Sequence, residues 1–408
     1  MLPYSPPFDP KNPPQGTMIV NLTTDGSNGD DNIDATGADV LVIFPENNTK
    51  PRTAQVFISN PSNVVVVGGE LTMAGAIPTG GACFEVENAS GEVFIEGLLI
   101  SATGGNNDQQ DAFQGASWVN SNGQKWTFQN VHIVGVSNSV PNSSNHPDCF
   151  QAYGYLNGRG EWGTVGECKF HNCSFYTGYQ GVFADDNNHC HVKGPFLFSN
   201  TNIEASNDGN PTSYLFWLAD GTNVSPPDWY PQAYIGPNVH CKAHTGQPLD
   251  KCIWTPGGTL QSNGDLVYTN NASVFPASHH PLMVNAGLSA DEARFVSGHP
   301  STGDYCPVAN CGLNYVSPGY GSLSPTPAPA PIPVPAPTPE PAPAPTPVPT
   351  VNLDALLDGA FGIIAGTILV RDATGWKALP PGQPGQILTC FGPDQAPGWT
   401  TLSINITS

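Results

Sequence analysis

The sequence predicts an all-β protein: a right-handed parallel β-helix, a proline-rich polyproline II linker and a small β-rich C-terminal module. Two recurring sequence phrases and the composition support this fold class. The 408 residues include 45 Gly and 43 Pro, and only 11% of them are charged. Such a composition is typical of short strands joined by turns and is poor in helix formers.

The first phrase is an apolar residue, a polar residue, Asn and then a further polar and apolar stretch. It occurs at residues 128–133, 170–175 and 198–203, and a looser copy with Gly in place of Asn lies at 94–100. Asn tolerates left-handed backbone angles, and its amide can bond to a copy of itself one layer away. Each copy therefore predicts a strand, a one-residue corner and a second strand. Unequal spacing between the copies indicates layers that keep their strands and vary their loops.

The second phrase places a polar residue next to an inward Phe. It contains Phe113, Phe150, Phe183 and Phe216, which we align in one register. Two phrases that alternate around one period predict two faces of a coil, with Phe stacked on Phe at the inter-strand spacing of about 4.8 Å.

The segment from Asn21 to Tyr320 resembles the pectate-lyase-like right-handed β-helix superfamily, which includes bacterial polysaccharide lyases, glycosidases and viral tailspikes. The acidic, Gly-rich turn Asp25–Asp31, followed by the apolar run Val40–Pro45, is similar to the first-rung entry of that group, although the intervening helix is nearly absent. The resemblance implies the fold and leaves the activity open.

Four regions follow from these patterns. Residues 1–20 are a Pro-rich N-terminal arm, 21–321 the β-helix with a loop-rich C-terminal cap, 322–350 a rigid linker and 351–408 a separate module. In the linker every odd position from 325 to 349 is Pro, which predicts a polyproline II rod of roughly 80 Å.

The C-terminal region resembles a short module of phage tail-fibre and other virion appendage proteins. The resemblance lies in Gly366–Leu379, Gly382–Leu388 and Pro397–Leu402. Modules of this size are too short to fold well alone, which implies trimerisation or docking on a virus particle.

The net charge and the N-terminal sequence limit the partners and the location that are expected for the protein. The formal net charge is −21 without a basic stripe, so nucleic acid is not an expected partner. The sequence contains no run of 18 apolar residues, so membrane insertion is not expected. The first residues lack the pattern of a secretory signal, which favours release as part of a virion; an extracellular, secreted protein would need a signal upstream of Met1.

Two close cysteine pairs are candidates for disulfides. Cys241 with Cys252 and Cys306 with Cys311 each lie in Gly- and Pro-rich sequence beyond the repeats. No Cys or His spacing resembles a zinc site, so no cofactor is expected, with Ca²⁺ as the alternative that a lyase reaction leaves open.

Candidate chemistry follows the second phrase. If the register holds, Asp111 and Asp148 lie on adjacent layers, and one of the two carboxyl pKa values should rise. In an inverting glycosidase Asp148 would be the acid and Asp111 or Asp185 the base, about 6.5–9.5 Å apart. In a lyase His146 would accept the proton, and such a reaction also needs Lys, Arg or Ca²⁺ to neutralise a uronate.

Carbohydrate contacts are expected from the same phrase and from the loops that follow it. Amides and aromatic rings suit sugar binding, because the C–H faces of sugars pack on aromatic side chains. The candidates are Gln114, Gln151, Tyr153, Trp118, Trp162 and Trp217. The alternative is a non-catalytic row in which stacked Asp and Gln only form polar ladders.

The leading functional hypothesis is a virion appendage (a spike, tail fibre or head fibre), expected to be a homotrimer. Its β-helix would bind and, if catalytic, cleave a host-surface polysaccharide, and its C-terminal module would contact virion structural proteins. The alternatives are a secreted polysaccharide lyase or glycoside hydrolase, and a structural or adhesive fibre protein without catalysis.

Overall fold

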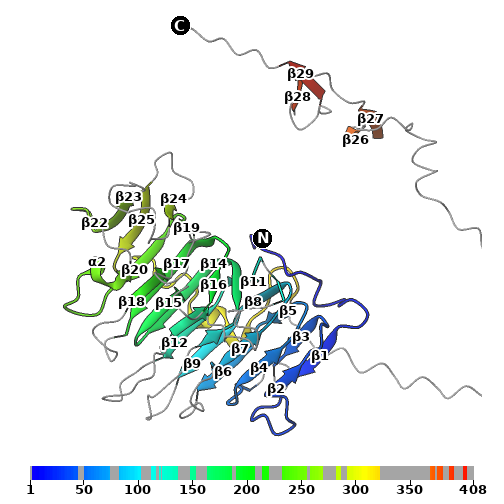
Figure 1. Ribbon diagram of the computed structural model, residues 1–408, viewed down its shortest axis with the longest axis horizontal. Helices are drawn as coiled ribbons and strands as arrows, with labels where there is room; N and C mark the ends of the chain where they lie inside the picture. The colour runs from blue at the N-terminus through cyan, green and yellow to red at the C-terminus, as the bar shows by residue number, and fades with distance from the viewer. Residues whose placement is uncertain are drawn as a thin grey trace, which may run out of the picture. The chain divides into compact units, whose positions relative to one another are not determined.

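The computed structural model separates the chain into two compact units, Met1–Ala330 and Pro331–Ser408, which we describe individually (Figure 1). The structure describes residues 2–44, 50–73, 82–102, 112–115, 119–120, 122–136, 148–152, 163–185, 190–206, 214–219, 232–254, 258–269, 282–285, 292–321, 368–372, 375–379, 386–389 and 398–401. The predicted linker at 322–350 lies outside these residues.

The first unit is all-β and consists mostly of parallel strands in a small and a large sheet, which confirms the predicted β class. The small sheet has eight strands in chain order, each parallel to the next. They are β2 (Asn32–Asp34), β4 (Val56–Ser59), β7 (Phe84–Glu87), β10 (Phe113–Gln114), β13 (Asp148–Ala152), β15 (Gln180–Asp185), β18 (Tyr214–Ala219) and β21 (Ile253–Trp254).

The large sheet has seventeen strands, most of which form two parallel rows. The first row contains β1 (Met18–Asn21), β3 (Val40–Ile43), β5 (Val64–Val67), β8 (Glu92–Glu96), β11 (Gln124–Gln129), the first parts of β14 (Thr164–Thr177) and β17 (Phe196–Ala205), β19 (Gln232–Ile235) and β24 (Leu282–Asn285). The second row contains β6 (Glu70–Met73), β9 (Leu99–Ala102), β12 (His132–Val136), the later parts of β14 and β17, β20 (Val239–Lys242) and β25 (Glu292–Ser297).

The chain visits the small sheet, the first row and the second row in turn. For example, β7, β8 and β9 pair with β10, β11 and β12 respectively, so each circuit adds one parallel strand to each row. Three short elements depart from this order: β16 (His191–Val192) pairs with the start of β14, and β22 (Thr259–Leu260) and β23 (Asp265–Thr269) add antiparallel strands beside β25. A single helical turn, α2 (Leu249–Cys252), precedes β21. The result is a stack of layers (Figure 1).

The corners between the first and second rows carry the residues that the first phrase predicts. Asn130, Asn172 and Asn200 have φ values of 54°, 52° and 45°, and Gly97 takes this place with φ 72°. Asn172 Nδ2 donates to Asn130 Oδ1 at 2.5 Å, so the expected amide ladder is present between these two layers. The prediction of left-handed Asn corners is confirmed.

A second line of asparagines, which we did not expect, follows strands of the small sheet. Asn60 and Asn88 have φ values of 55° and 60°. Asn88 Nδ2 donates to Asn60 Oδ1 at 2.7 Å, and Asn60 Nδ2 donates to Asp34 Oδ1 at 3.2 Å. Two edges of the stack therefore carry ladders of polar side chains.

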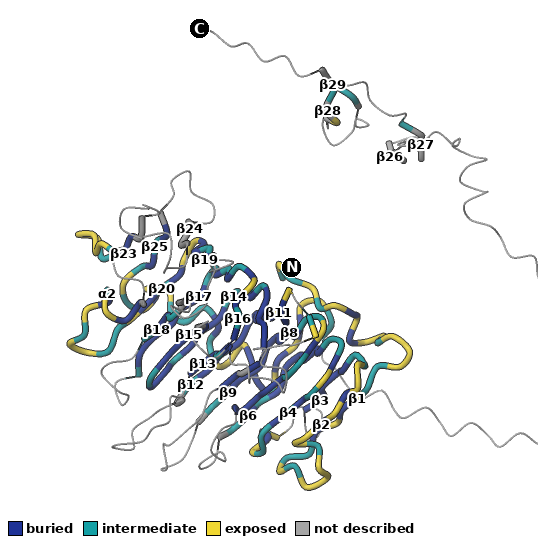
Figure 2. The backbone as a smooth tube through the Cα atoms, in the orientation of Figure 1, coloured by how far each residue is buried: buried dark blue, intermediate teal, exposed yellow. Residues whose placement is uncertain are grey.

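The interior of the stack is apolar, and Figure 2 shows the strands buried over most of their length, with exposed residues mainly at turns and in the N-terminal segment. The Phe128 and Phe170 rings stack with centroids 5.1 Å apart, and the Phe170 and Phe198 rings stack at 4.6 Å. Their planes differ by only 9° and 3°. Stacking of the first phrase is thus confirmed in the core.

The expected register of the second phrase is correct for two layers and wrong beyond them. Phe113 pairs with Phe150, as predicted. Phe150 then pairs with Val182, whereas Phe183 pairs with Trp217. Both residues at 182 and 183 are apolar, so the sequence alternation does not distinguish them, and a shift of one residue exchanges the inner and outer faces.

A fully buried arginine holds the first layers together. The Arg52 guanidinium donates to the backbone oxygens of Thr23, Ala54 and Gln55 at 2.5, 3.1 and 2.9 Å. It also forms an ion pair with Asp30 at 3.1 Å. Because Thr23 precedes the acidic turn Asp25–Asp31 and Asp30 belongs to it, Arg52 fixes that turn against the stack.

The segment 298–321, here called the strap, packs against strands of earlier layers. Gly312 N donates to Gly97 O at 2.8 Å, and Gly69 N donates to Gly312 O at 3.2 Å. The Tyr315 hydroxyl donates to Glu96 Oε1 at 2.7 Å and accepts from Asn130 Nδ2 at 2.9 Å. A side chain at position 97 would collide with the Tyr315 ring, which explains the glycine at this corner.

The strap and the N-terminal arm meet on the outer face of the first row. Tyr4, Phe8, Tyr315 and Tyr320 contribute to one apolar cluster with residues of β3, β5 and β8. The arm is therefore part of the fold, and the predicted loop-rich cap after residue 270 contains β24, β25 and the strap.

The described residues of the second unit form two antiparallel hairpins. β26 (Ile368–Asp372) pairs with β27 (Gly375–Leu379), and β28 (Gln386–Thr389) pairs with β29 (Gly398–Thr401). The β-rich character predicted for this module is present. Among the described residues, no helix has the length and apolar character needed to cross a membrane.

Candidate functional site

The outer face of the small sheet brings polar and aromatic positions of the second phrase into one row. Successive strands pair Glu85 with Gln114, Gln114 with Gln151, Gln151 with Phe183, and Phe183 with Trp217. We call these five positions the outer row. At about 4.8 Å per layer the row extends over roughly 19 Å.

Two carboxylates lie at one end of the outer row. In β7, Phe84 and Val86 belong to the core, and alternation along a strand directs Glu85 and Glu87 to the opposite face. Glu85 is only 4% exposed, and Gln55 Nε2 donates to its Oε2 at 3.2 Å. The side chains of Glu85 and Glu87 are close enough for each to affect the pKa of the other.

This arrangement changes the proton affinity of both groups. Burial, followed by the charge of Glu87, raises the pKa of Glu85 to about 7. Burial also raises the pKa of Glu87, against the hydrogen bond from Glu85. A carboxyl group with a pKa raised to about 7, beside a second carboxyl group whose pKa is also raised, is an arrangement suited to general acid–base chemistry.

Our sequence reasoning missed this pair, although a signal was present. The segment Phe84-Glu85 has the same Phe–polar order as Phe113-Gln114 and lies one layer earlier. The alternation of Glu85 and Glu87 with apolar residues also places both carboxylates on one side of the strand.

Asp148 lies beside the core instead of on the outer row. It is fully buried at the start of β13. With its amide nitrogen turned toward Asp148, Gln180 donates to both carboxylate oxygens at 2.9 and 3.0 Å. Burial and then the Asp148 charge raise the pKa of the nearby Tyr179 hydroxyl. Asp148 is therefore a buried carboxylate whose two oxygens are satisfied by hydrogen bonds within the protein.

The structure tests the other predicted acid–base residues to different extents. Ala112 N donates to Asp148 O at 2.7 Å, so the layers of Asp111 and Asp148 are adjacent, but Asp111 and His146 lie outside the described residues. Asp185 is five positions along β15 from Gln180, the partner of Asp148. This is roughly 16 Å along the strand. The strand pairing therefore does not bring Asp185 beside Asp148.

The predicted carbohydrate contacts are partly described. Gln114 and Gln151 pair as expected, and Gln151 is half-buried. Trp217 lies in an aromatic group, with its ring centroid 5.6 Å from that of Phe183 and 4.5 Å from that of Tyr214. The remaining candidates lie outside the described residues and stay predictions: Tyr153, Trp118 and Trp162.

The two predicted disulfide pairs are buried thiols in this structure. Cys306 and Cys311 pack in the same apolar cluster, together with Leu99. Burial, followed by the neighbouring Cys252, raises the pKa of Cys241. Each pair is thus brought together by the fold, and the covalent bonds themselves stay predictions.

Comparisons of the chain with protein-family models, with curated proteins and with solved structures found no match. The chemistry of the outer row is therefore the basis for a functional proposal.

Proposed function

We propose that the first unit is a right-handed parallel β-helix of the pectate-lyase-like kind. Three observations support this: the chain alternates between the small and large sheets, successive circuits pair in parallel, and left-handed Asn or Gly residues form the corners. The Pro-rich segment 322–350 then acts as a polyproline II spacer between this unit and the C-terminal hairpins.

The outer face of the small sheet binds a host-surface polysaccharide. The observation that carries this proposal is the outer row, in which two amide positions lie between a carboxylate pair and two aromatic positions on consecutive layers. Amides hydrogen-bond sugar hydroxyls, and aromatic faces pack on sugar C–H groups. A linear glycan lying across the layers would contact the partly exposed Gln151 and Trp217, with Phe183 packed beneath Trp217.

The charge of the protein favours a particular class of glycan. The formal net charge is −21, and Glu85 and Glu87 lie at one end of the row. An anionic polysaccharide would be repelled over much of this surface, because no basic stripe offsets the acidic residues. A neutral or amino-sugar polysaccharide fits better than a polyuronate.

The setting of this activity is a virion appendage, a spike, tail fibre or head fibre. The stack binds the glycan, and the proline segment acts as a spacer that holds the stack away from the C-terminal module. This module trimerises and contacts virion structural proteins. A secreted polysaccharide lyase or glycoside hydrolase and a non-catalytic adhesive fibre are the alternatives. Size measurement of the full chain and its detection in purified phage particles decide between them; a monomer that is absent from particles would overturn the appendage.

Glycan cleavage is a second candidate function, which the Glu85–Glu87 pair favours. With a pKa of about 7, Glu85 holds a proton at neutral pH for part of the time. A neighbouring carboxylate is available as the base. Asp148 is bound by Gln180 within the fold. We therefore assign the acid–base role to the glutamate pair.

Binding and cleavage are tested with capsular and lipopolysaccharide glycans. Trp217→Ala and Gln151→Ala should weaken glycan binding by about tenfold or more, as expected for loss of a stacking or hydrogen-bonding group. Tyr234→Ala is the matched control, because Tyr234 is an aromatic residue of the large sheet. Equal binding by Trp217→Ala, Gln151→Ala and Tyr234→Ala would contradict the proposed surface.

Cleavage is measured as new reducing ends or unsaturated products. Glu85→Gln should abolish it with binding retained, whereas Asp148→Asn should alter stability more than turnover. If the wild-type protein leaves every bound glycan unchanged, the protein is a binder and the cleavage proposal is wrong.

A further inference from the structure

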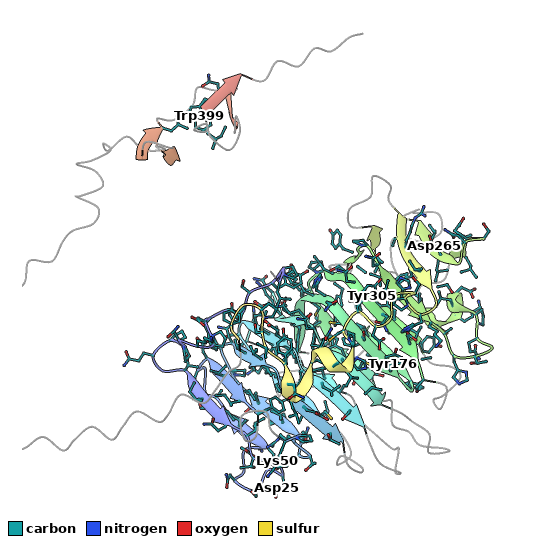
Figure 3. All side chains as sticks on the ribbon, turned by 180° about the vertical axis from the view of Figure 1, so that it is seen from behind. Asp25, Lys50, Tyr176, Asp265, Tyr305 and Trp399 are labelled. Carbon is teal, nitrogen blue, oxygen red and sulfur yellow. The ribbon has the colours of Figure 1, made fainter. Side chains whose placement is uncertain are left out.

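A second cluster of chemically active side chains lies on the second row, where the strap covers β17. Glu204 comes from β17, and His299 and Asp304 come from the strap. One ligand atom from each of these residues lies within 4.8 Å of the other two. Figure 3 shows the strap in yellow in front of the stack in this region, where Tyr176 and Tyr305 are labelled.

Glu204 is the buried centre of the cluster. Its carboxylate is only 1% exposed, and its Oε1 lies 2.5 Å from His299 Nδ1. Asn202 Nδ2 donates to the same oxygen at 3.0 Å. Lys242 Nζ lies 3.5 Å from the other oxygen, and its side chain is half exposed and free to turn into solvent.

Asp304 is oriented from the other side. Its Oδ1 accepts from the Tyr176 hydroxyl at 2.7 Å and from Asn202 Nδ2 at 2.9 Å. Ser174 Oγ donates to Asn202 Oδ1 at 2.6 Å, so the amide that orients both carboxylates is itself fixed. Such outer hydrogen bonds to ligating carboxylates are typical of protein metal centres.

We propose that Glu204, His299 and Asp304 bind one divalent transition-metal ion of the Zn²⁺ type, which joins the strap to the stack. Two carboxylates and one imidazole are a donor set that suits Zn²⁺ with a water as fourth ligand. The imidazole makes Ca²⁺, which takes oxygen ligands only, a poor occupant. This site is independent of the glycan surface on the small sheet.

Metal binding requires the ligand atoms, which all lie within 4.8 Å of one another, to adjust by at most about 1.5 Å. Two ligand atoms about 2.0–2.1 Å from one tetrahedral ion are roughly 3.3 Å apart. His299 Nδ1 and Glu204 Oε1, now 2.5 Å apart, must therefore separate by less than about 1 Å. The His299 side chain is 39% exposed, so it can move, and it leaves an entry path for the ion.

The test uses the full chain after treatment with a chelator. Titration calorimetry with Zn²⁺ should give one site per chain, Co²⁺ should give visible absorption bands, and Zn²⁺ should raise the melting temperature. Ca²⁺ at equal concentration should show no binding in calorimetry and should leave the melting temperature unchanged. His299→Ala and Asp304→Asn should each weaken Zn²⁺ binding by more than about tenfold, the effect seen even for outer partners of metal ligands.

His244→Ala is the matched control, because it removes a histidine that does not belong to the cluster. It should bind Zn²⁺ like the wild type. Circular dichroism of the metal-free variants shows whether each one folds. No binding by the wild-type protein, or equal binding by folded His299→Ala, would overturn the proposal, whatever the outcome of the glycan experiments.

Discussion

Replacing Asn172 by alanine should destabilise the first unit by about 2–3 kcal/mol, because Asn172 has two separate roles. Its φ of 52° lies in the left-handed region, where an alanine costs about 1–2 kcal/mol. Its Nδ2 donates to Asn130 Oδ1 at 2.5 Å, and such a hydrogen bond contributes about 1 kcal/mol net.

A matched pair of variants separates the two roles. Asn172→Gly keeps the left-handed corner and removes only the amide, with an added cost of about 0.5–1 kcal/mol for the freedom of glycine in the unfolded chain. It should therefore be about 0.5–1 kcal/mol more stable than Asn172→Ala. Asn310→Ala, at an exposed residue of a short 3₁₀ turn, is the control and should stay within about 0.5 kcal/mol of the wild type.

The assay is urea unfolding of the full chain, followed by far-ultraviolet circular dichroism and compared at equal m values. If Asn172→Gly were as unstable as Asn172→Ala, or less stable, corner strain would not explain the asparagine. If both matched Asn310→Ala, the amide ladder would contribute nothing to stability.

Three further predictions concern the glutamate pair, the buried arginine and the strap. The pKa of Glu85 is raised from 4.5 to about 7, so the folded state binds more protons than the unfolded state between these values, and stability should fall as pH rises from 4.5 to 7, by up to about 3 kcal/mol. Glu85→Gln should flatten this part of the melting temperature profile, and an unchanged slope would contradict the assignment. Arg52→Ala should cost about 3–5 kcal/mol in thermal unfolding, because it removes a fully buried guanidinium that pairs with Asp30 and donates to three backbone oxygens; a loss below about 1 kcal/mol would show that these contacts are dispensable. Tyr315→Phe should cost about 1–3 kcal/mol, since Glu96 loses a donor in a buried site, and it should increase hydrogen exchange in the strap; unchanged exchange would contradict the role of this hydroxyl.

Local patterns were sufficient for the repeating part of the fold. The phrase around Asn130, Asn172 and Asn200 predicted strand, left-handed corner and strand, because only Asn and Gly adopt that backbone conformation readily. The pairing of Phe113 with Phe150 followed from the same kind of spacing. In both cases the information lies within a few residues of each position.

The candidate site was harder to predict from the sequence, because the residues that share it are determined by the strand register. A shift of one residue, which pairs Phe150 with Val182, moved Phe183 to the outer row. Alternation at an apolar pair does not define this register; packing of the neighbouring layers does. Glu85 and Glu87 could have been found from alternation, whereas their burial depends on the surrounding structure.

The sequence by itself determined the β-rich class and the left-handed corners, because each of these depends on local backbone preferences. Only the tertiary structure decided which side chains share the outer row, how Asp148 is bound, and that the strap brings His299 and Asp304 to Glu204. These contacts join residues from different layers, and their proximity comes from the summed packing of the whole stack.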